Sequence, residues 1–530
     1  MEEASRGVTP PPVQAPTSRE KKYDRQLRLW AASGQRALEE SHVLLVIGES
    51  TQGSNSSVAG IETLKNLILP SIGSFTIADA AIVQEADLGI NFFLEPASLG
   101  KSRGEEAKRL LSELNPDVTG HSISRPLADW LPVQDSLKPY NLIILCAPVE
   151  TQHLQRLCSH SSQSAIPLIY LQSIGFYSSF SIQLPAEFPI VDTHPDPETT
   201  TDLRLLAPWP ELEAAAEALG DITKLSDHDH GHIPYLLILL YCLKQWHKEH
   251  GSYPLDFKDK TAFRDTVRAA ARTNNPEGGE ENFDEASAAV LKTVAPPPIG
   301  QACKEMFAMD SCTSLSANSA NLWIIAHAIK TFYDHHSALP LPGSLPDMKA
   351  TSSGYIQLQN IYKSKARKDV AEVTATVRAL EKAQAKSTQI ADSEIELFCK
   401  NASHVRVLTN PDNLPVPALR LNRPETTLAN IQSSLELDWE NMLPVFIGLN
   451  PASLPKSLVS RIEDEEKQEA ITNSTAEVER MEGGELHNIS SVTGGIVAQE
   501  AIKLLTRQYV PVDGTAVYDG IRAKLAVFRL

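Results

Sequence analysis

The chain has 530 residues, too many for one ordinary hydrophobic core, so its length predicts two or three domains. Hydrophobic residues make up 42% of the chain, which is enough to fill those cores. The formal net charge of -18 argues against nucleic acid or an anionic membrane as a partner, because both bind basic protein surfaces.

The cysteines, the N-terminus and the apolar runs predict an acidic, soluble, intracellular protein. Six cysteines are scattered without a CxxC pair, which favours reduced thiols over a disulfide framework or a zinc ribbon. Residues 1–20 lack the apolar core of a signal peptide, and we expect a disordered tail there. The longest apolar run, 233–243, has about half the length that a bilayer requires, so it predicts a core helix.

Strand and helix patterns alternate from the end of this tail to about residue 170. The expected helices are one amphipathic helix or two short ones within 19–41, a helix from 58 and a helix over 103–117, and the expected strands are 43–47, 74–79, 141–148 and 166–171. This alternation with short links predicts a parallel sheet covered by helices on both faces, with ligands at the carboxyl ends of its strands.

Helical patterns then dominate, and strand patterns become rare. Helices are expected over 235–250, 321–336, 364–386 and 460–481, followed by a helix over 487–505 and two short strands within 515–530. The last helix and strands are expected to return to the first domain. The sequence thus predicts an α/β Rossmann-type domain, residues 21–172 plus 484–530, interrupted by a mainly helical insertion over 173–483.

The link between the first strand and its helix is a weak candidate for a phosphate loop. A phosphate cradle requires closely spaced glycines, which let backbone N–H groups approach the anion at a helix N-terminus. Here Gly48, Gly53 and Gly60 are far apart, and Glu49 places a negative charge where phosphates would bind. The pattern favours a surface loop. Asp79, at the end of the next strand, occupies a position typical of a ribose-binding or metal-binding carboxylate, but a lone carboxylate is not specific.

The segment SDHDHGH offers the ligand types of a metal site. His228, His230 and His232 alternate with Asp227 and Asp229. Alternate side chains point to one side only in a strand, and a helix is expected to begin directly after them. Capping and packing are therefore the favoured roles.

The remaining candidates are a thiol and two arginines. Cys312 lies beside a polar run without an obvious base, so a packed structural cysteine is favoured over a nucleophile. Arg25 and Arg28 lie in the first expected helix, where a solvated helix face is the usual interpretation. An arginine there can also reach a phosphate of another subunit, because its rigid fork matches phosphate oxygens.

Several segments together resemble a known family. In order, KYDRQLRLW, ETLKNLILPSIGSFTIAD, GINFFL, AKRLLSELNPDV and GGIVAQEAIKLL resemble the adenylation domain of the ubiquitin-activating superfamily, which includes the bacterial MoeB and ThiF proteins. Within the insertion, DLRLLAPWPEL, HDHGHIPYLLILLYCLKQWH and LPGSLPDMKATSSGYIQLQNIYKSKARKD resemble the regulatory subunits of neddylation-activating enzymes. The resemblance spans nearly the whole chain beyond the tail and implies a ThiF/MoeB-like fold.

The resemblance implies that most catalytic groups of the superfamily are lost. Active members carry a glycine-rich loop, two aspartates after the second strand, an arginine, a lysine and a magnesium-binding aspartate. Of the carboxylates only Asp79 remains, since the second aspartate falls on Ala81 and the magnesium ligand on or near Pro148. The arginine falls on Ile90 and the lysine on Arg103. Without the metal ligand and the arginine, nothing holds a triphosphate in line for attack.

The resemblance also implies one retained role. Active members have a thioester-forming cysteine shortly after the segment that here reads IPLIYLQSIGFYSSFSIQLP, which contains none, and the zinc-binding CxxC pairs are missing. In these dimers, however, the arginine of an N-terminal YxRQ segment enters the ATP site of the other subunit. That role falls on Arg25, acting in trans.

Taken together, the resemblance implies a catalytically inactive regulatory subunit that binds no cofactor or metal. Its expected partners are a catalytic subunit holding ATP, magnesium and zinc, the ubiquitin-like modifier Nedd-eight (Rub) and the cognate conjugating enzyme, in cytoplasm and nucleus. One alternative is a self-sufficient homodimeric adenylating enzyme that uses Asp79 and Cys312. Another is the regulatory subunit of the SUMO-activating enzyme, against which the long insertion argues. A dinucleotide-dependent dehydrogenase is least favoured, because no proton-relay pair is evident.

Overall fold

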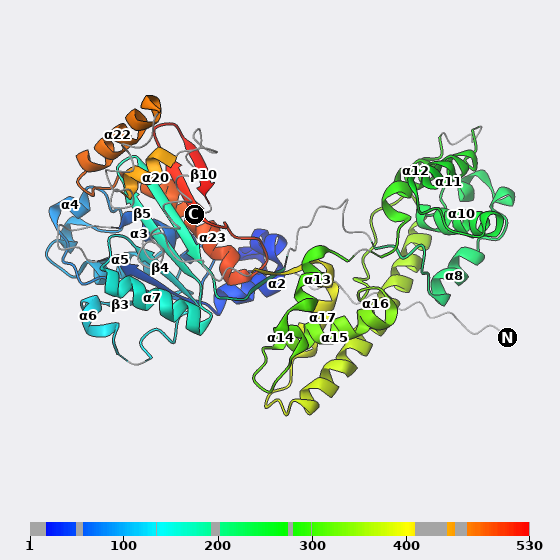
Figure 1. Cartoon of the computed structure of the whole chain (residues 1–530), viewed down its shortest axis with the longest axis horizontal. Helices are drawn as coiled ribbons and strands as arrows, with labels where there is room; N and C mark the ends of the chain where they lie inside the picture. Colours follow the sequence, from blue (N-terminus) through cyan, green and yellow to red (C-terminus); the bar gives the residue numbers. More distant parts are fainter. Residues whose placement is uncertain are drawn as a thin grey trace. The chain divides into compact units, whose positions relative to one another are not determined.

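The computed structural model divides the chain into two compact units (Figure 1). It describes residues 17–48, 57–133, 135–191, 202–273, 279–297, 299–408, 443–450 and 464–528. Unit 1 comprises Met1–Ile190 and Leu408–Leu530, and unit 2 comprises Val191–Val407. The chain leaves unit 1 through β7 (Phe188–Val191) and returns through β8 (Val405–Leu408), and these two strands form a small sheet of their own.

Unit 1 is built on a sheet of eight strands. In spatial order they are β10 (Lys524–Phe528), β9 (Thr515–Asp519), β6 (Tyr177–Gln183), β5 (Leu168–Ile174), β4 (Leu142–Cys146), β1 (His42–Ile47), β2 (Ser74–Ala78) and β3 (Thr119–Ile123). The strands from β5 to β3 are parallel, whereas β6, β9 and β10 add antiparallel pairs. The sheet is therefore mixed. Its strands from β5 to β3 form a parallel half, in which helices connect successive strands.

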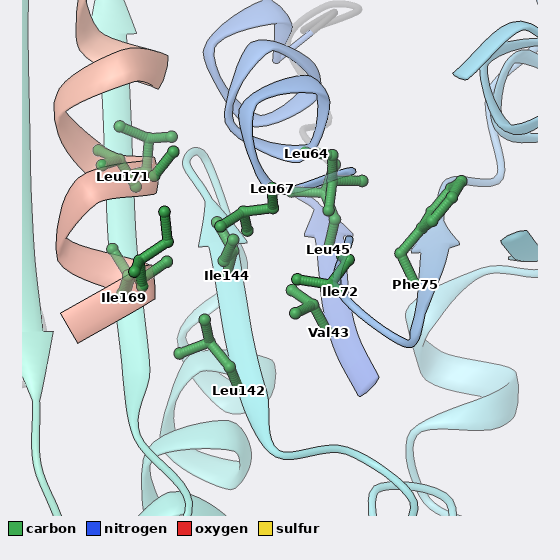
Figure 2. Close-up of a cluster of buried hydrophobic side chains, with 14 of the residues drawn as sticks. Val43, Leu45, Leu64, Leu67, Ile72, Phe75, Leu142, Ile144, Ile169 and Leu171 are labelled. Atoms are coloured by element: carbon green, nitrogen blue, oxygen red, sulfur yellow. The ribbon is translucent and has the colours of Figure 1, made fainter. Parts of the chain in front are cut away.

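Helices cover both faces of this sheet. The helices of unit 1 are α1 (Ser18–Lys22), α2 (Asp24–Glu39), α3 (Val58–Ile68), α4 (Glu85–Leu88), η1 (Pro96–Ser98), α5 (Arg103–Ser112), α6 (Leu127–Trp130), α7 (Thr151–Ser164), α20 (Leu443–Leu449), α22 (Glu465–Arg480) and α23 (His487–Thr506). Val43 and Leu45 of β1 pack in the cluster shared with α3 and α23, while Leu44 and Val46 pack in the cluster shared with α6 and α7. Figure 2 shows the first of these clusters.

Burial on both faces explains why β1 appears in the sequence as an uninterrupted apolar run rather than an alternating one. The two long helices on the first face also lie very close together. A Cβ atom on Gly494 of α23 would lie 2.6 Å from the Cβ atom of Glu62 in α3. Only glycine permits this approach, which ties the C-terminal helix to the first helix of the sheet domain.

Unit 2 is mainly helical. Its elements are α8 (Pro210–Glu217), η3 (Ile222–Lys224), α9 (Asp227–His230), α10 (Tyr235–His250), α11 (Phe257–Ala269), α12 (Glu281–Thr293), α13 (Gln301–Ala308), α14 (Asp310–Thr313), α15 (Asn321–His336), α16 (Ser352–Ala383), α17 (Asp392–Lys400) and η4 (Ala402–His404). Two hydrophobic clusters fill it, and α16 contributes Leu358 and Tyr362 to one and Val373 and Val377 to the other. Across the described ranges, no helix has both the length and the apolar composition to span a bilayer.

The structure corrects three sequence-based expectations and confirms a fourth. The insertion is shorter than 173–483, because β6 lies in the sheet and α20 and α22 belong to unit 1. The parallel sheet expected up to about residue 170 is confirmed by β1 to β5, and β6, β9 and β10 extend it with antiparallel pairs. The polar edge strand β3 carried no apolar signal and was not predicted. Helix α1 begins inside the predicted tail, at Ser18, because Thr17 and Glu20 form a reciprocal capping box; residues 1–16 lie outside the described part of the chain.

Candidate functional site

At the carboxyl end of β2, Asp79 is buried and bound by an arginine. Arg103, the first residue of α5, donates from Nε to Asp79 Oδ2 at 2.7 Å and from Nη2 to Oδ1 at 3.2 Å. Its Nη1 also donates to Asp87 Oδ1 at 3.1 Å. Burial by itself would lower the pKa of Arg103, but the two carboxylates outweigh that effect and raise the pKa above its ordinary value.

This ion-pair cluster contains Asp79, the carboxylate that the resemblance matches to the superfamily's site. The three side chains are only 4–5% exposed. Asp79 Oδ1 additionally accepts from the backbone N–H of Ala81 at 3.0 Å. A carboxylate that binds a ribose or a metal must have oxygens free to accept or coordinate, and those of Asp79 already have partners within the chain. The structure thus shows Asp79 engaged on both carboxylate oxygens by groups of its own chain.

A second carboxylate lies at the N-terminus of α3. Glu485 Oε2 accepts from the backbone N–H of Ala59 at 3.1 Å and from Ser490 Oγ at 2.6 Å. The side chain is buried, which raises the pKa of Glu485 to about 7, although hydrogen bonds from Ser490 and from the backbone of Ala59 and Val58 act in the opposite direction. A helix N-terminus attracts anions because its first N–H groups have no partner within the helix.

The position of Glu485 is relevant to the link between β1 and α3, which was a weak candidate for a phosphate loop. In nucleotide-binding folds, phosphates bind at the N-terminus of the helix that follows the first strand. In this chain the corresponding helix end holds the protein's own carboxylate. Sequence reasoning missed Glu485, because it is 426 residues from Ala59 and nothing in the local sequence signals the contact.

The described glycines near this helix have a packing role. A Cβ atom on Gly48 would lie 1.8 Å from the carbonyl oxygen of Pro148, and one on Gly60 would lie 2.5 Å from Cys146 Sγ. Both glycines thus permit close approach between β1, α3 and the end of β4. Gly53 and Glu49 of the predicted loop lie outside the described residues.

Arg25 lies in the first turn of α2 and is exposed. It forms no hydrogen bond or ion pair with any residue of the described ranges. Arg28 differs, because its Nη2 lies 3.0 Å from Asp24 Oδ2. The neighbouring Tyr23 and Trp30 are buried at 4% and 6% exposure, so the backbone on either side of Arg25 is anchored. Both arginines are exposed, and Arg25 is the one of the two without an intramolecular partner in the described ranges.

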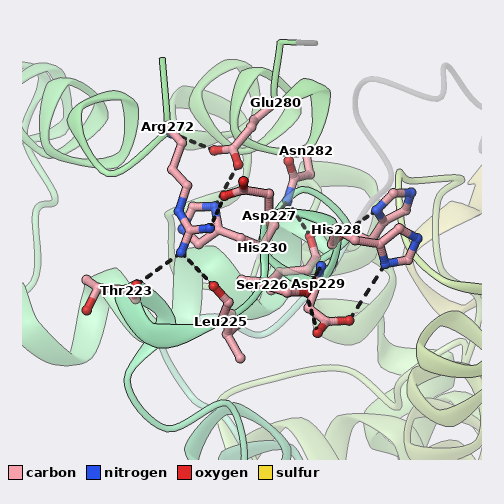
Figure 3. Close-up of polar contacts among 12 residues, drawn as sticks. Thr223, Leu225, Ser226, Asp227, His228, Asp229, His230, Arg272, Glu280 and Asn282 are labelled. Carbon is pink, nitrogen blue, oxygen red and sulfur yellow. Dashed lines mark hydrogen bonds and ion pairs between the residues drawn. The ribbon is translucent and has the colours of Figure 1, made fainter. Parts of the chain in front are cut away.

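The histidine-rich segment forms a structural network rather than a ligand set (Figure 3). Asp227, His228, Asp229 and His230 lie in α9, which Ser226 caps, so the three rings do not share a strand face. His230 is buried and its Nδ1 lies 2.8 Å from Glu280 Oε1, while His228 stacks on His232 with ring centroids 4.3 Å apart. Within the described residues, no group of three or more His, Cys, Asp or Glu could hold a metal ion.

Cys312 is fully buried in α14 and packs in a hydrophobic cluster of unit 2. Burial raises the pKa of its thiol to about 11, so little thiolate exists at neutral pH. His327 Nδ1 lies 2.7 Å from the backbone oxygen of Cys312 and not beside its sulfur. The structure therefore places this cysteine, and equally the other five, in buried positions unsuited to a nucleophile.

Comparison with known proteins places these features in a family. Residues 23–530 match the ThiF family. The NEDD8-activating enzyme E1 regulatory subunit of Xenopus laevis is 34% identical over 97% of this chain and 99% of its own length. The Arabidopsis thaliana regulatory subunit AXL is 32% identical over 95% and 98%, respectively.

Among solved structures, Escherichia coli MccB is 16% identical to this chain. The match covers 32% of this chain and 47% of MccB, with a TM-score of only 0.27. The sequence similarity over nearly the full length is sufficient by itself and confirms the resemblance seen in the motifs. The chain belongs to the ThiF family and, within it, to the family of NEDD8-activating enzyme E1 regulatory subunits.

Proposed function

We propose that this chain is the regulatory subunit of a heterodimeric activating enzyme for the ubiquitin-like modifier NEDD8. Together with a catalytic subunit it supports ATP-dependent adenylation of the modifier's C-terminus and its transfer to a cysteine of that partner as a thioester. The observation that carries this proposal is the similarity to regulatory subunits over nearly the whole length of both chains.

The chain is catalytically inactive on its own and binds no ATP, magnesium or zinc. A metal-bound triphosphate does not fit the residues present. Asp79 is engaged by Arg103, Glu485 fills the N-terminus of α3, and Pro148, where the magnesium ligand is expected, has no side-chain oxygen. ATP, magnesium and zinc are therefore assigned to the catalytic subunit, along with the reactive cysteine.

Arg25 is the residue through which this chain contributes to catalysis. Its guanidinium is exposed, has no partner among the described residues, and extends from a segment anchored by Tyr23 and Trp30. A fixed cation directed at the phosphates in the partner's site stabilises the charge that develops there during adenylate formation. Arginine suits this role because its planar fork can bind two phosphate oxygens at once.

The modifier and the cognate conjugating enzyme are the further partners of this assembly, and we expect it in cytoplasm and nucleus. A self-sufficient homodimer that uses Asp79 and Cys312 is disfavoured by the ion pair of the first residue and the burial of the second. A role in SUMO activation is disfavoured by the family of the full-length relatives.

The test is ATP–pyrophosphate exchange with purified subunits. The isolated chain should show no exchange, and the complete heterodimer should be active. Arg25→Ala should slow exchange by about 100- to 1000-fold without preventing assembly, since removing one such donor or cation has effects of at least that size. Arg28→Ala is the matched control on the same helix and should change the rate little. Exchange by the isolated chain, or equal rates for Arg25→Ala and the wild type, would refute the corresponding part of the proposal.

A further inference from the structure

Helix α2 is broken between the segment that carries Arg25 and the later turns of the same helix. Trp30 has φ −129° and ψ 18°, and Ala31 has φ 56° and ψ −179°, so the backbone is not helical at these two residues. A break of this kind removes the regular helical acceptors and donors around it. The carbonyl groups just before it must then find partners elsewhere.

Two residues from the C-terminal part of the chain supply those partners. Gln508 donates from Nε2 to the carbonyl oxygen of Trp30 at 2.9 Å, and the hydroxyl of Tyr509 donates to the carbonyl oxygen of Leu29 at 3.1 Å. Gln508 is buried and lies two residues after the end of α23, the long helix that packs against α3. The break is thus held from a rigid part of unit 1.

The side chain at the break is fixed as well. Trp30 donates from Nε1 to Gln35 Oε1 at 3.1 Å, and Gln35 in turn donates to the carbonyl oxygen of Pro70 at 3.2 Å. A Cβ atom on Gly34 would lie 2.8 Å from Gln508 Nε2 and equally close to Trp30 Cβ. Gly34 thus allows Trp30 and Gln508 to pack closely at this turn.

We propose that Gln508 and Tyr509 are positioning residues for Arg25, setting the orientation of its helical segment relative to the rest of unit 1. This inference rests on the proposed function, in which Arg25 acts in the partner's ATP site. Neither residue touches the phosphates. They act by choosing one backbone orientation at Leu29 and Trp30, from which Arg25 extends.

The geometry explains why so small a contact matters. The segment that carries Arg25 is held at Tyr23, which is 4% exposed, and at the break. Arg25 precedes Trp30 by five residues, or about 7.5 Å of helix, so a 10° rotation of this segment at the break would move its backbone by about 1.3 Å. Displacements of about 1 Å at a catalytic group can reduce a rate by about a hundredfold. A single hydroxyl that restricts this rotation therefore has a measurable effect on the chemical step.

The test is a double-mutant cycle in the assembled heterodimer. Tyr509→Phe removes only the hydroxyl, and it should lower kcat for ATP–pyrophosphate exchange roughly fivefold, the change in population expected from one neutral hydrogen bond. The KM for the modifier should stay unchanged, because binding of the modifier does not depend on Arg25. In the Arg25→Ala background, Tyr509→Phe should have no further effect.

Tyr518→Phe is the matched control, because no hydrogen bond of the Tyr518 hydroxyl occurs within the described residues. Thermal unfolding of both variants should match the wild type, which separates positioning from loss of structure. The inference is wrong if Tyr509→Phe leaves kcat unchanged, or if it lowers kcat equally with and without Arg25. If Arg25→Ala itself has no effect, the proposed role of Arg25 fails instead, so the two failures are distinguishable.

Discussion

Replacing Arg103 by methionine tests whether the buried ion-pair cluster determines what Asp79 does. The substitution keeps the bulk of the side chain and removes the guanidinium that lies between Asp79 and Asp87. Both carboxylates are about 5% exposed. Removing one partner of a buried pair costs about 3–5 kcal/mol, because a charge remains buried without compensation. We expect Arg103→Met to lower the stability of unit 1 by an amount in that range.

The control lies on the same helix. Arg109 also binds acidic side chains, among them Glu95, but it is 44% exposed. Pairs at the surface contribute at most about 1 kcal/mol, because water screens them and their long side chains lose freedom. Arg109→Met should therefore have a much smaller effect than Arg103→Met. Combining Arg103→Met with Asp79→Asn and Asp87→Asn should recover part of the lost stability, since no buried charge then remains unpaired.

Hydrogen–deuterium exchange of peptides from β2 and α5 is the appropriate measurement, because it reports on unit 1 separately from unit 2. Urea unfolding followed by circular dichroism gives the change for the whole chain. If the peptides from β2 and α5 exchange at the same rate in Arg103→Met and Arg109→Met, the cluster does not hold Asp79. Asp79 would then not be kept from a nucleotide by Arg103.

Two further predictions concern groups whose pKa is shifted by burial. The pKa of Glu485 is raised from 4.5 to about 7, so its contribution to stability is fully present below about pH 4.5 and is lost as pH rises through about 7. The free energy of unfolding of Glu485→Gln, measured in urea, should therefore rise relative to that of the wild type by up to about 3 kcal/mol between pH 5 and pH 8, at about 1.36 kcal/mol per pKa unit. Glu479→Gln, at the exposed end of α22, should show no such trend. If the difference between Glu485→Gln and the wild type does not change with pH, burial does not raise the pKa of Glu485. Cys312→Ala should leave modifier–thioester formation by the heterodimer unchanged, because its buried thiol has a pKa of about 11; loss of the thioester would instead favour a reactive role for this cysteine.

The fold was largely predictable where strands are buried on both faces. The apolar runs of β1, β4 and β5 identified the central strands, because only strands covered on both sides lack polar positions. The strand β3 could not be found in this way, since it lies at the sheet edge and its five residues include no strong apolar pattern. The antiparallel direction of β6 could not be predicted from its own residues either, because side chains alternate in the same way in parallel and antiparallel strands.

Residue type alone says little about which contacts the candidate site makes. Ala81 and Pro148 have no side-chain oxygen to offer a metal, and this follows from the sequence without the structure. The choice of Arg25 over Arg28 came from the resemblance, and the structure adds that Arg28 pairs with Asp24 while Arg25 has no partner among the described residues.

The order of sheet domain and helical insertion and the family could both be inferred before folding was considered, because they depend on residue type and on spacing along the chain. The partners of the buried charges became known from the folded chain alone. Arg103 reaches Asp79 across 24 residues and Glu485 reaches Ala59 across 426. Such contacts follow from which strands and helices become neighbours in the folded chain, and a buried carboxylate must take whichever donors that packing brings to it.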